Sequence, residues 1–305
     1  MKVLLRDLKR FRFLFLLVLP GLLYYLIFCY VPMAGVVVAF QDYRITKGFF
    51  ESDWVGLKHF IGFFSSELSF KIIRNTLLLN IYSLLWGFPI PILFAIALSE
   101  VKSNAFRKTI QTVSYLPYFI STVVTVGLVG MLLNVNSGAV NAVIESLGGK
   151  RIDFLLEPKY FRTIFIGANI WKGFGWTSII YLAAILGINP ELFEAATIDG
   201  ASKLRRIWHI TLPGIAGTII IMLLLNIGSL MSSSFEMVYL LQKPLNYEVS
   251  DVISTYVYRR GIAVTQGFPN FSFATAVGLF QSIVNIILLV GANALSKKFT
   301  ETTLF

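Results

Sequence analysis

The chain has 305 residues, of which 56% are hydrophobic and only 14% are charged, against about 25% charged residues in an ordinary soluble domain. This composition excludes a soluble globular protein and predicts a protein that lies in a membrane. The formal net charge of +10 does not indicate nucleic-acid binding, because the basic residues gather at the ends of apolar stretches, where orientation signals and anionic headgroups account for them.

Six apolar stretches are long enough to cross the hydrocarbon core of a bilayer, which takes about 20 helical residues. In chain order they are residues 13–40, 76–98, 113–133, 163–187, 214–241 and 274–296. We therefore expect an all-α polytopic fold with one six-helix membrane domain over residues 13–296, a short segment before it (1–12) and a tail after it (297–305). The first stretch is too long for a cleaved signal peptide, so we expect it to remain as an anchor.

The placement of lysine and arginine predicts which side of the membrane each loop faces. These residues are densest before the first span, after the second span and at the C-terminal end: Lys2, Arg6, Lys9, Arg10, Arg12, Lys102, Arg107, Lys108, Lys297 and Lys298. Because cytoplasmic loops carry the excess of basic residues, we expect both termini to be cytoplasmic. The longest polar loops, residues 41–75, 134–162 and 242–273, then lie outside.

Two further segments, one in the second span and one in the first outer loop, contain residues that indicate local structure. Pro89 and Pro91 remove backbone donors from the second span and are expected to break its hydrogen-bond ladder. Residues 54–64 mix aromatic and charged side chains like a helix on the outer membrane surface, although a helix buried among the spans would give the same pattern.

No pattern for catalysis is found in the sequence. There is no G-x-x-x-x-G-K-[ST] pattern to hold a nucleotide, so if ATP drives this protein, another chain must hydrolyse it. H-E-x-x-H and G-x-S-x-G are also absent, and His59 and His209 fall in loops on opposite sides of the membrane. The single cysteine, Cys29, excludes a cysteine metal cluster. We expect a non-catalytic chain that binds no metal and no cofactor of its own.

Polar residues at membrane depth are costly, so they should face protein or a water-filled cavity. Such residues are Asn80, Asn169, Lys172, Asn226, Glu236, Gln281 and Asn285. Asn226, Ser229 and Ser233 recur at helical spacing in the fifth span, and Glu236 continues the stripe. Lys172 is expected to reach a headgroup or to pair with a carboxylate.

From this pattern we predict a lining for a solute path. Its candidate residues are Asn169, Trp171, Asn226, Ser229, Ser233, Glu236, Tyr239 and Gln281. Aromatic faces suit sugar rings, while amides and carboxylates suit sugar hydroxyls. Interfacial aromatic belts and hydrogen bonds between helices would give the same residue types, so a purely structural role stays open.

A polar insert at residues 190–213 separates the fourth and fifth spans. It contains Glu194-Ala195-Ala196, then Asp199-Gly200, and after nine further residues Ile210-Thr211-Leu212-Pro213. The pattern predicts a short helix, a turn at Gly200, where glycine supplies a φ that other residues avoid, and a second short helix stopped by Pro213. On the expected cytoplasmic side, such an insert is accessible for binding by another protein.

This insert resembles the EAA coupling loop of the membrane subunits of binding-protein-dependent ABC importers. Other pieces resemble the carbohydrate-uptake, maltose-permease-like family, and within it the LplB-type permeases for oligosaccharides and polysaccharides: residues 116–121, 194–213, 235–236 and 247–259. The resemblance implies the type I ABC importer permease fold and a set of residues that contact the ATPase: Glu194, Ala195, Ala196, Asp199, Gly200 and Pro213. The large external insertion of the bigger maltose permease subunit is missing, so its external contacts are not carried over.

The resemblance also implies an assembly in which this chain forms half of a translocation pathway. The expected partners are a second, related permease in a heterodimer, two ATP-binding subunits that hold ATP and magnesium, an extracellular solute-binding protein and a carbohydrate. Only the resemblance supports a non-identical partner permease. Two alternatives stay open: an ABC permease for a polyamine or an amino acid, since the loop is shared across importer families, and an ATP-independent facilitator, which the loop disfavours.

Overall fold

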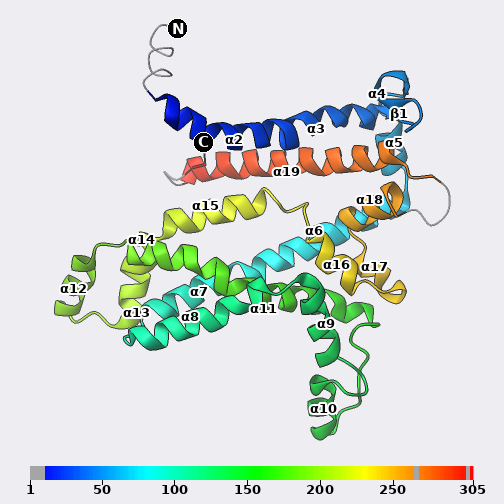
Figure 1. Cartoon of the computed structure of the whole chain (residues 1–305). Coiled ribbons are helices and arrows are strands. Elements are labelled where there is room, and N and C mark those ends of the chain that lie inside the picture. The colour runs from blue at the N-terminus through cyan, green and yellow to red at the C-terminus, as the bar shows by residue number, and fades with distance from the viewer. Residues whose placement is uncertain (1–10, 264–267, 300–302, 305) are drawn as a thin grey trace. The chain divides into compact units, whose positions relative to one another are not determined.

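The computed structural model describes residues 11–263, 268–299 and 303–304, so the basic residues Lys2, Arg6, Lys9 and Arg10 lie outside the described part. Most of the described chain is helical, and its two short strands, β1 (Gln41–Asp42) and β2 (Asp53–Trp54), form a two-residue antiparallel pairing (Figure 1). The chain divides into two compact units, one of Met1–Ser66 with Val257–Leu279 and one of Glu67–Tyr256 with Phe280–Phe305.

Three described helices are long and apolar enough to cross a membrane by themselves: Arg12–Phe40, Glu67–Ser99 and Phe271–Lys298. Three further pairs of helices pass the same test together but are bent, and counting each pair as one span gives six. The structure therefore confirms an all-α polytopic fold with the expected number of apolar spans.

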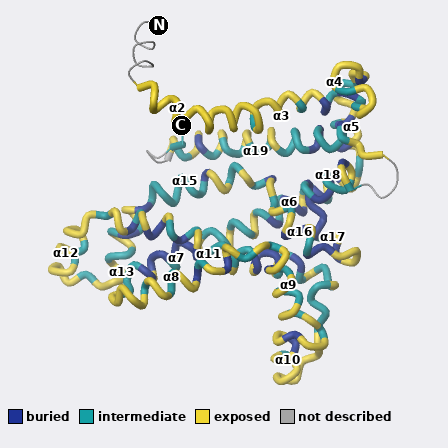
Figure 2. The backbone as a smooth tube through the Cα atoms, in the orientation of Figure 1, coloured by how far each residue is buried: buried dark blue, intermediate teal, exposed yellow. Residues whose placement is uncertain are grey.

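The first unit begins with the helix of the first span. It consists of α2 (Arg12–Tyr25), a π-helical turn (Leu26–Tyr30), α3 (Val31–Met33) and a 3-10 stretch (Ala34–Phe40). None of the most apolar part of this helix is buried, and Figure 2 shows it almost entirely as exposed. Apolar side chains with such exposure suit a lipid environment.

The rest of this unit surrounds the short β pairing. It contains α4 (Gly48–Glu51), α5 (Lys58–Phe64) and the beginning of α19 (Phe271–Phe299). Within residues 54–64, α5 buries His59 and Phe63 but exposes Ile61 and Phe64, so this helix has one buried and one exposed face. His59 Nε2 lies 3.0 Å from the carbonyl oxygen of Gln41, a contact that ties α5 to β1.

The second unit is built around α11 (Pro158–Leu186). The second span packs against it and consists of α6 (Glu67–Gly87) and α7 (Pro89–Ser99), so this span begins well before residue 76. The expected break occurs at Phe88. Pro89 begins α7, where the missing N–H of proline would have had no partner within the helix anyway.

The third span bends sharply, so the prediction of one helix over residues 113–133 is wrong. It consists of α8 (Asn104–Phe119) and α9 (Thr122–Leu132), which meet at 101°. The Ser121 hydroxyl accepts the N–H of Val124 at 3.3 Å and so caps the start of α9. Beyond α9, the chain forms α10 (Ala139–Ser146) within a loop. In this loop the hydrogen-bonded ion pair with Arg151 lowers the pKa of Glu145.

Close approach between α8 and α11 depends on one glycine. A Cβ built on Gly175 would lie 2.1 Å from the carbonyl oxygen of Ser114, so any larger residue would push the helices apart. Directly after Gly175, the ring of Trp176 stacks on the ring of Tyr118 of α8, with centroids 4.7 Å apart. The aromatic residues near the fourth span thus hold these two helices together.

The fifth span is broken, and the prediction of a continuous helix over residues 214–241 is wrong. It consists of α15 (Ala216–Ile227), a non-helical segment at residues 228–234, and α16 (Phe235–Leu241). The segment contains two glycine-or-serine clusters, Gly228-Ser229 and Ser232-Ser233-Ser234. Such residues favour caps and turns over helix interiors. The stripe from Asn226 to Glu236 at helical spacing therefore does not exist as one helix face.

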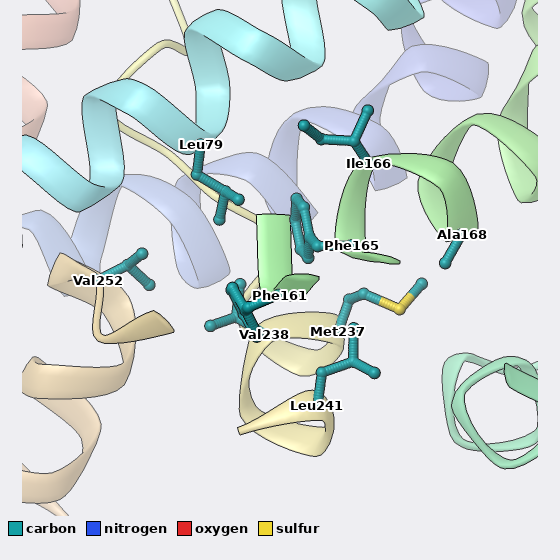
Figure 3. Close-up of a cluster of buried hydrophobic side chains, with 9 residues drawn as sticks. All are labelled: Leu79, Phe161, Phe165, Ile166, Ala168, Met237, Val238, Leu241 and Val252. Atoms are coloured by element: carbon teal, nitrogen blue, oxygen red, sulfur yellow. The ribbon is translucent and has the colours of Figure 1, made fainter. Parts of the chain in front are cut away.

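The largest buried apolar cluster joins α6, α11 and α16. Its residues are Leu79, Phe161, Phe165, Ile166, Ala168, Met237, Val238, Leu241 and Val252 (Figure 3). A second cluster joins α7 to α11 and Ile215. These clusters hold α16 and α7, the second helix of the second span, against α11.

A buried polar network also holds this unit together, next to α17 (Tyr247–Ser250) and α18 (Ile253–Gly261). Asn75 is fully buried and donates to the carbonyl oxygens of Glu248 and Asp251 at 2.9 and 3.2 Å. Its own carbonyl oxygen accepts from Arg162 at 3.3 Å. One side chain of α6 thereby joins α11 and the segment around α17.

We expect Asn75→Ala to destabilise the protein, because it leaves the carbonyl groups of Glu248 and Asp251 and the guanidinium of Arg162 without this partner. Such a loss costs about 3 kcal/mol, which for a unit of this size lowers the melting temperature by roughly 6–12 °C. The measurement is the thermal stability of the detergent-purified protein. Asn104→Ala is the control, because Asn104 is exposed. Equal melting temperatures for the two variants would contradict a stabilising role of the network.

Candidate functional site

The polar insert forms two short helices joined by a tight turn. Asn189 accepts the N–H of Glu191 at 3.1 Å and so caps α12 (Pro190–Ile198), and Ser202 accepts the N–H of Arg205 at 3.4 Å and caps α13 (Lys203–Arg206). Between the helices, Gly200 has a φ of 71°. The two helices and the glycine turn follow the prediction from the sequence.

The second of these helices runs further than predicted. It continues through a π-helical turn (Ile207–Thr211) into α14 (Leu212–Gly214) and meets α15 at 60°. The helix ends at Gly214, so the predicted stop at Pro213 is displaced by one residue. The chain leaves the insert only after Gly214.

The insert presents a largely exposed surface. Of the predicted contact residues, Ala196 is half-buried, while the rest are exposed: Glu194, Ala195, Asp199, Gly200 and Pro213. Three apolar side chains beside them are also exposed, namely Ile198, Leu204 and Trp208 at 86%, 69% and 67%. Apolar side chains gathered on a polar insert are typical of a surface that another protein covers.

One arginine connects this insert to the second span. Arg206 donates to the Thr197 hydroxyl at 2.8 Å, and its guanidinium lies 3.8 Å from a carboxylate oxygen of Glu100, directly after α7. Both charged side chains are largely buried, with exposed fractions of 20% and 27%. Lys203 Nζ approaches the same carboxylate at 4.0 Å. The two helices of the insert are thus tied to each other and to the end of α7.

A cavity of about 280 Å³ lies among α6, α7, α11 and the fifth span. Its lining residues are Asn80, Ser83, Leu84, Gly87, Phe88, Pro91, Ile166, Asn169, Ile170, Gly173, Phe174, Thr177, Tyr181, Asn226, Ser229, Leu230 and Ser232. All of these described residues are uncharged, and many carry amide or hydroxyl groups. The cavity therefore offers hydrogen bonds without ionic contacts.

The structure brings together three of the eight residues predicted for the solute path: Asn169, Asn226 and Ser229. The other five are not in the described lining: Trp171 on α11, Ser233, Glu236 and Tyr239 after the break in the fifth span, and Gln281 on α19. Gln281 still reaches the cavity wall indirectly, because its amide donates to the Ser232 hydroxyl at 3.2 Å. Ser233 lies instead against Ser254, and the ring of Tyr239 stacks on Phe235.

The three asparagines of the cavity share one orientation. Asn80, Asn169 and Asn226 each donate their amide to the carbonyl oxygen four residues earlier in their own helix, at 2.9, 3.0 and 2.7 Å. Only the NH₂ group can make this contact, so the assignment of the amide atoms is fixed. Within the described residues the structure shows no donor to these three side-chain oxygens, so each is available as an acceptor.

Lys172 makes a contact that was not predicted. Its ammonium group donates to the Thr122 hydroxyl at 2.9 Å, and the described residues show no carboxylate paired with it. The contact joins α11 to the first turn of α9 at the bend of the third span. This lysine is a link between helices and does not line the described cavity.

Several lining residues were missed from the sequence, chiefly Ser83, Thr177 and Ser232. Ser83 and Thr177 each belong to a row of small or polar residues at helical spacing. Asn80, Ser83 and Gly87 follow each other at helical spacing in α6, and Asn169, Gly173 and Thr177 do so in α11. A search for faces of small and polar residues within apolar spans finds these two helix faces, but not Ser232, which lies outside any helix.

The chain is similar to known bacterial proteins over nearly its whole length. Two relatives from Bacillus subtilis (strain 168) are 46% identical: Protein LplB, over 98% of this chain and 92% of the relative, and the polygalacturonan/rhamnogalacturonan transport system permease protein YteP, over 100% and 94%. A solved bacterial ABC transporter involved in the import of the acidic polysaccharide alginate contains a chain that is 42% identical, with a TM-score of 0.88, covering 97% of this chain and 99% of that one.

The family comparison covers most of the sequence. The description of binding-protein-dependent transport system inner membrane components matches residues 59–301, which include the insert, the cavity and all of the second unit's long helices. The chain therefore belongs to the family of binding-protein-dependent transport system inner membrane components.

Proposed function

We propose that this chain is the permease subunit of an ATP-driven importer of oligosaccharides and forms half of the translocation pathway. The observation that carries the proposal is the uncharged, hydrogen-bonding cavity lined by the second, fourth and fifth spans. Sugars are rich in hydroxyl groups, each of which can donate to an asparagine oxygen and accept from a serine hydroxyl. Full-length similarity to YteP, a polygalacturonan/rhamnogalacturonan permease, supports this substrate class.

The same cavity argues against a charged amine as substrate. A polyamine carries several ammonium groups that need carboxylate partners at membrane depth, and the described lining contains no carboxylate. An ATP-independent facilitator has no use for the exposed insert with its apolar side chains, which suits a docking partner. An importer powered by another subunit accounts for the cavity and the insert together.

The assembly follows from the insert. We place α12, α13 and both termini in the cytoplasm, where a separate ATPase binds Glu194, Ala195, Ala196, Asp199, Gly200 and Pro213. Two such ATPases hold ATP and magnesium, and a second, related permease supplies the other half of the pathway. An extracellular solute-binding protein delivers the substrate, as a related alginate transporter was solved in complex with a pentasaccharide-bound periplasmic protein.

The test is oligosaccharide uptake by the reconstituted complex with Asn226→Leu in place of the wild-type chain. Removing one acceptor from the cavity should raise the concentration for half-maximal uptake about three- to tenfold. Asn104→Leu, outside the cavity, is the control and should behave as wild type. Unchanged uptake of every oligosaccharide in a panel of uronic-acid and neutral sugars would remove Asn226 from the pathway.

A further inference from the structure

The break in the fifth span exposes backbone groups at membrane depth. Residues 228–234 are not helical, yet most of the N–H groups from Gly228 to Ser232 still donate to carbonyl oxygens three or four residues earlier. The N–H of Met231 has a side chain as its partner instead. Met231 is 2% exposed, and its N–H donates to the side-chain oxygen of Asn285 on α19 at 2.9 Å. Asn285 therefore satisfies a buried backbone donor created by the break.

The other end of the same amide acts on the next residue. Asn285 Nδ2 donates to the Ser232 hydroxyl oxygen at 2.9 Å, and Gln281 Nε2 donates to the same oxygen at 3.2 Å. Gln281 and Asn285 are four residues apart and so lie on one face of α19. Two amides of one helix converge on a single hydroxyl.

This arrangement fixes the direction of the hydroxyl proton. A serine hydroxyl has two acceptor lone pairs and one proton. Both acceptor positions of Ser232 are occupied by the amides, so its proton must donate elsewhere, and within the described residues the structure shows no acceptor for it. Ser232 is exposed and lines the cavity, so the proton is available to a molecule bound there.

We propose that Gln281 and Asn285 are positioning residues that hold Ser232 as a hydrogen-bond donor to the transported sugar. The three cavity asparagines present acceptors, and Ser232 adds a donor of fixed orientation. A sugar hydroxyl or ring oxygen accepts from it while neighbouring hydroxyls donate to the asparagines. The inference rests on the proposed function and assigns a specificity role to a part of α19 that does not itself line the described cavity.

The test uses the complete reconstituted complex and tetragalacturonate as the probe. Ser232→Ala removes the donor, and Gln281→Met removes one of the two amides while the Met231 N–H keeps its partner. We expect the KM for uptake to rise about three- to tenfold in Ser232→Ala and about two- to threefold in Gln281→Met, with the maximal rate nearly unchanged. Ser232→Thr keeps the hydroxyl and should restore a near-normal KM.

A double-mutant cycle separates positioning from general support. If Gln281 acts through Ser232, the variant with both Ser232→Ala and Gln281→Met has the KM of Ser232→Ala alone. Multiplied KM effects, or a fall in maximal rate without a KM change, would overturn the positioning role. Asn285→Leu should also raise KM, and a lower yield of this variant would report the unpaired Met231 N–H.

Two different outcomes separate a failure of the proposed function from a failure of the role assigned to Ser232. If the wild-type complex takes up neither tetragalacturonate nor any other oligosaccharide, the proposed function fails, and the role of Ser232 with it. If the wild-type complex takes up the probe but Ser232→Ala has an unchanged KM, only the role of Ser232, Gln281 and Asn285 is overturned.

Discussion

Replacing Gly200 with valine should remove solute-stimulated ATP hydrolysis from the assembled complex while the chain still inserts into the membrane. The φ of 71° at this position costs a residue with a Cβ about 1–2 kcal/mol, and a β-branched residue more. A Cβ built there meets no atom within 4 Å, so the strain comes from the backbone alone. About 1.4 kcal/mol changes the population of the native turn tenfold, and we expect at least that loss.

Gly200→Asn is the matched control for this prediction. Asparagine tolerates the left-handed conformation better than other residues with a side chain, and the open space around Gly200 accommodates it. ATP hydrolysis by purified complexes in the presence of binding protein and sugar is the measurement. Full stimulation in Gly200→Val would show that the turn between α12 and α13 does not bear on the ATPase. Loss in Gly200→Asn as well would point to contact by the glycine surface itself.

The second large effect is expected from Arg206→Met. This change removes the hydrogen bond to Thr197 and the ion pair with Glu100, which together connect the insert to the end of α7. Because α7 contributes Pro91 to the cavity wall, the loss should separate ATP hydrolysis from transport. We expect uptake to fall about tenfold, at the upper end of the coupling that single residues carry, while hydrolysis without sugar persists.

Arg205→Met is the control, because Arg205 is the neighbouring basic residue on α13 and is exposed. It removes the same charge without touching Glu100 in the described structure. Exchanging the charges, with Glu100→Arg and Arg206→Glu in one chain, should recover part of the uptake. Normal uptake in Arg206→Met would mean that the contacts of the insert with α7 do not transmit force.

Much of the fold follows from the sequence because apolar length alone defines a membrane span. The fourth and sixth stretches lie almost entirely within α11 and α19, and the first is helical throughout but changes from α-helix to a π-helical turn and a 3-10 stretch. The third and fifth stretches differ, because Ser121 and the residues from Gly228 onward provide turn and cap interactions that hydropathy does not register. Hydropathy therefore locates a span but not a break within it.

The candidate site was predictable only in part, for a related reason. Asn169, Asn226 and Ser229 stand out as polar residues at membrane depth, and each lies within or directly after a helix that forms the cavity. Glu236 was assigned by helical phase from Asn226, and the intervening break resets that phase. The contact of Asn285 with Ser232 joins residues 53 positions apart, so no local pattern contains it.

The jointed construction of the fifth span has a mechanical consequence. A continuous rod of this length would transmit any tilt of its inner half to its outer half, and the packed cluster around Met237 and Val238 would have to open and close with every cycle. With the break at residues 228–234, we expect α15 to be able to tilt while α16 keeps its place against α11. A partner that moves the insert would then change the shape of the cavity, and the apolar cluster around Met237 and Val238 would stay packed.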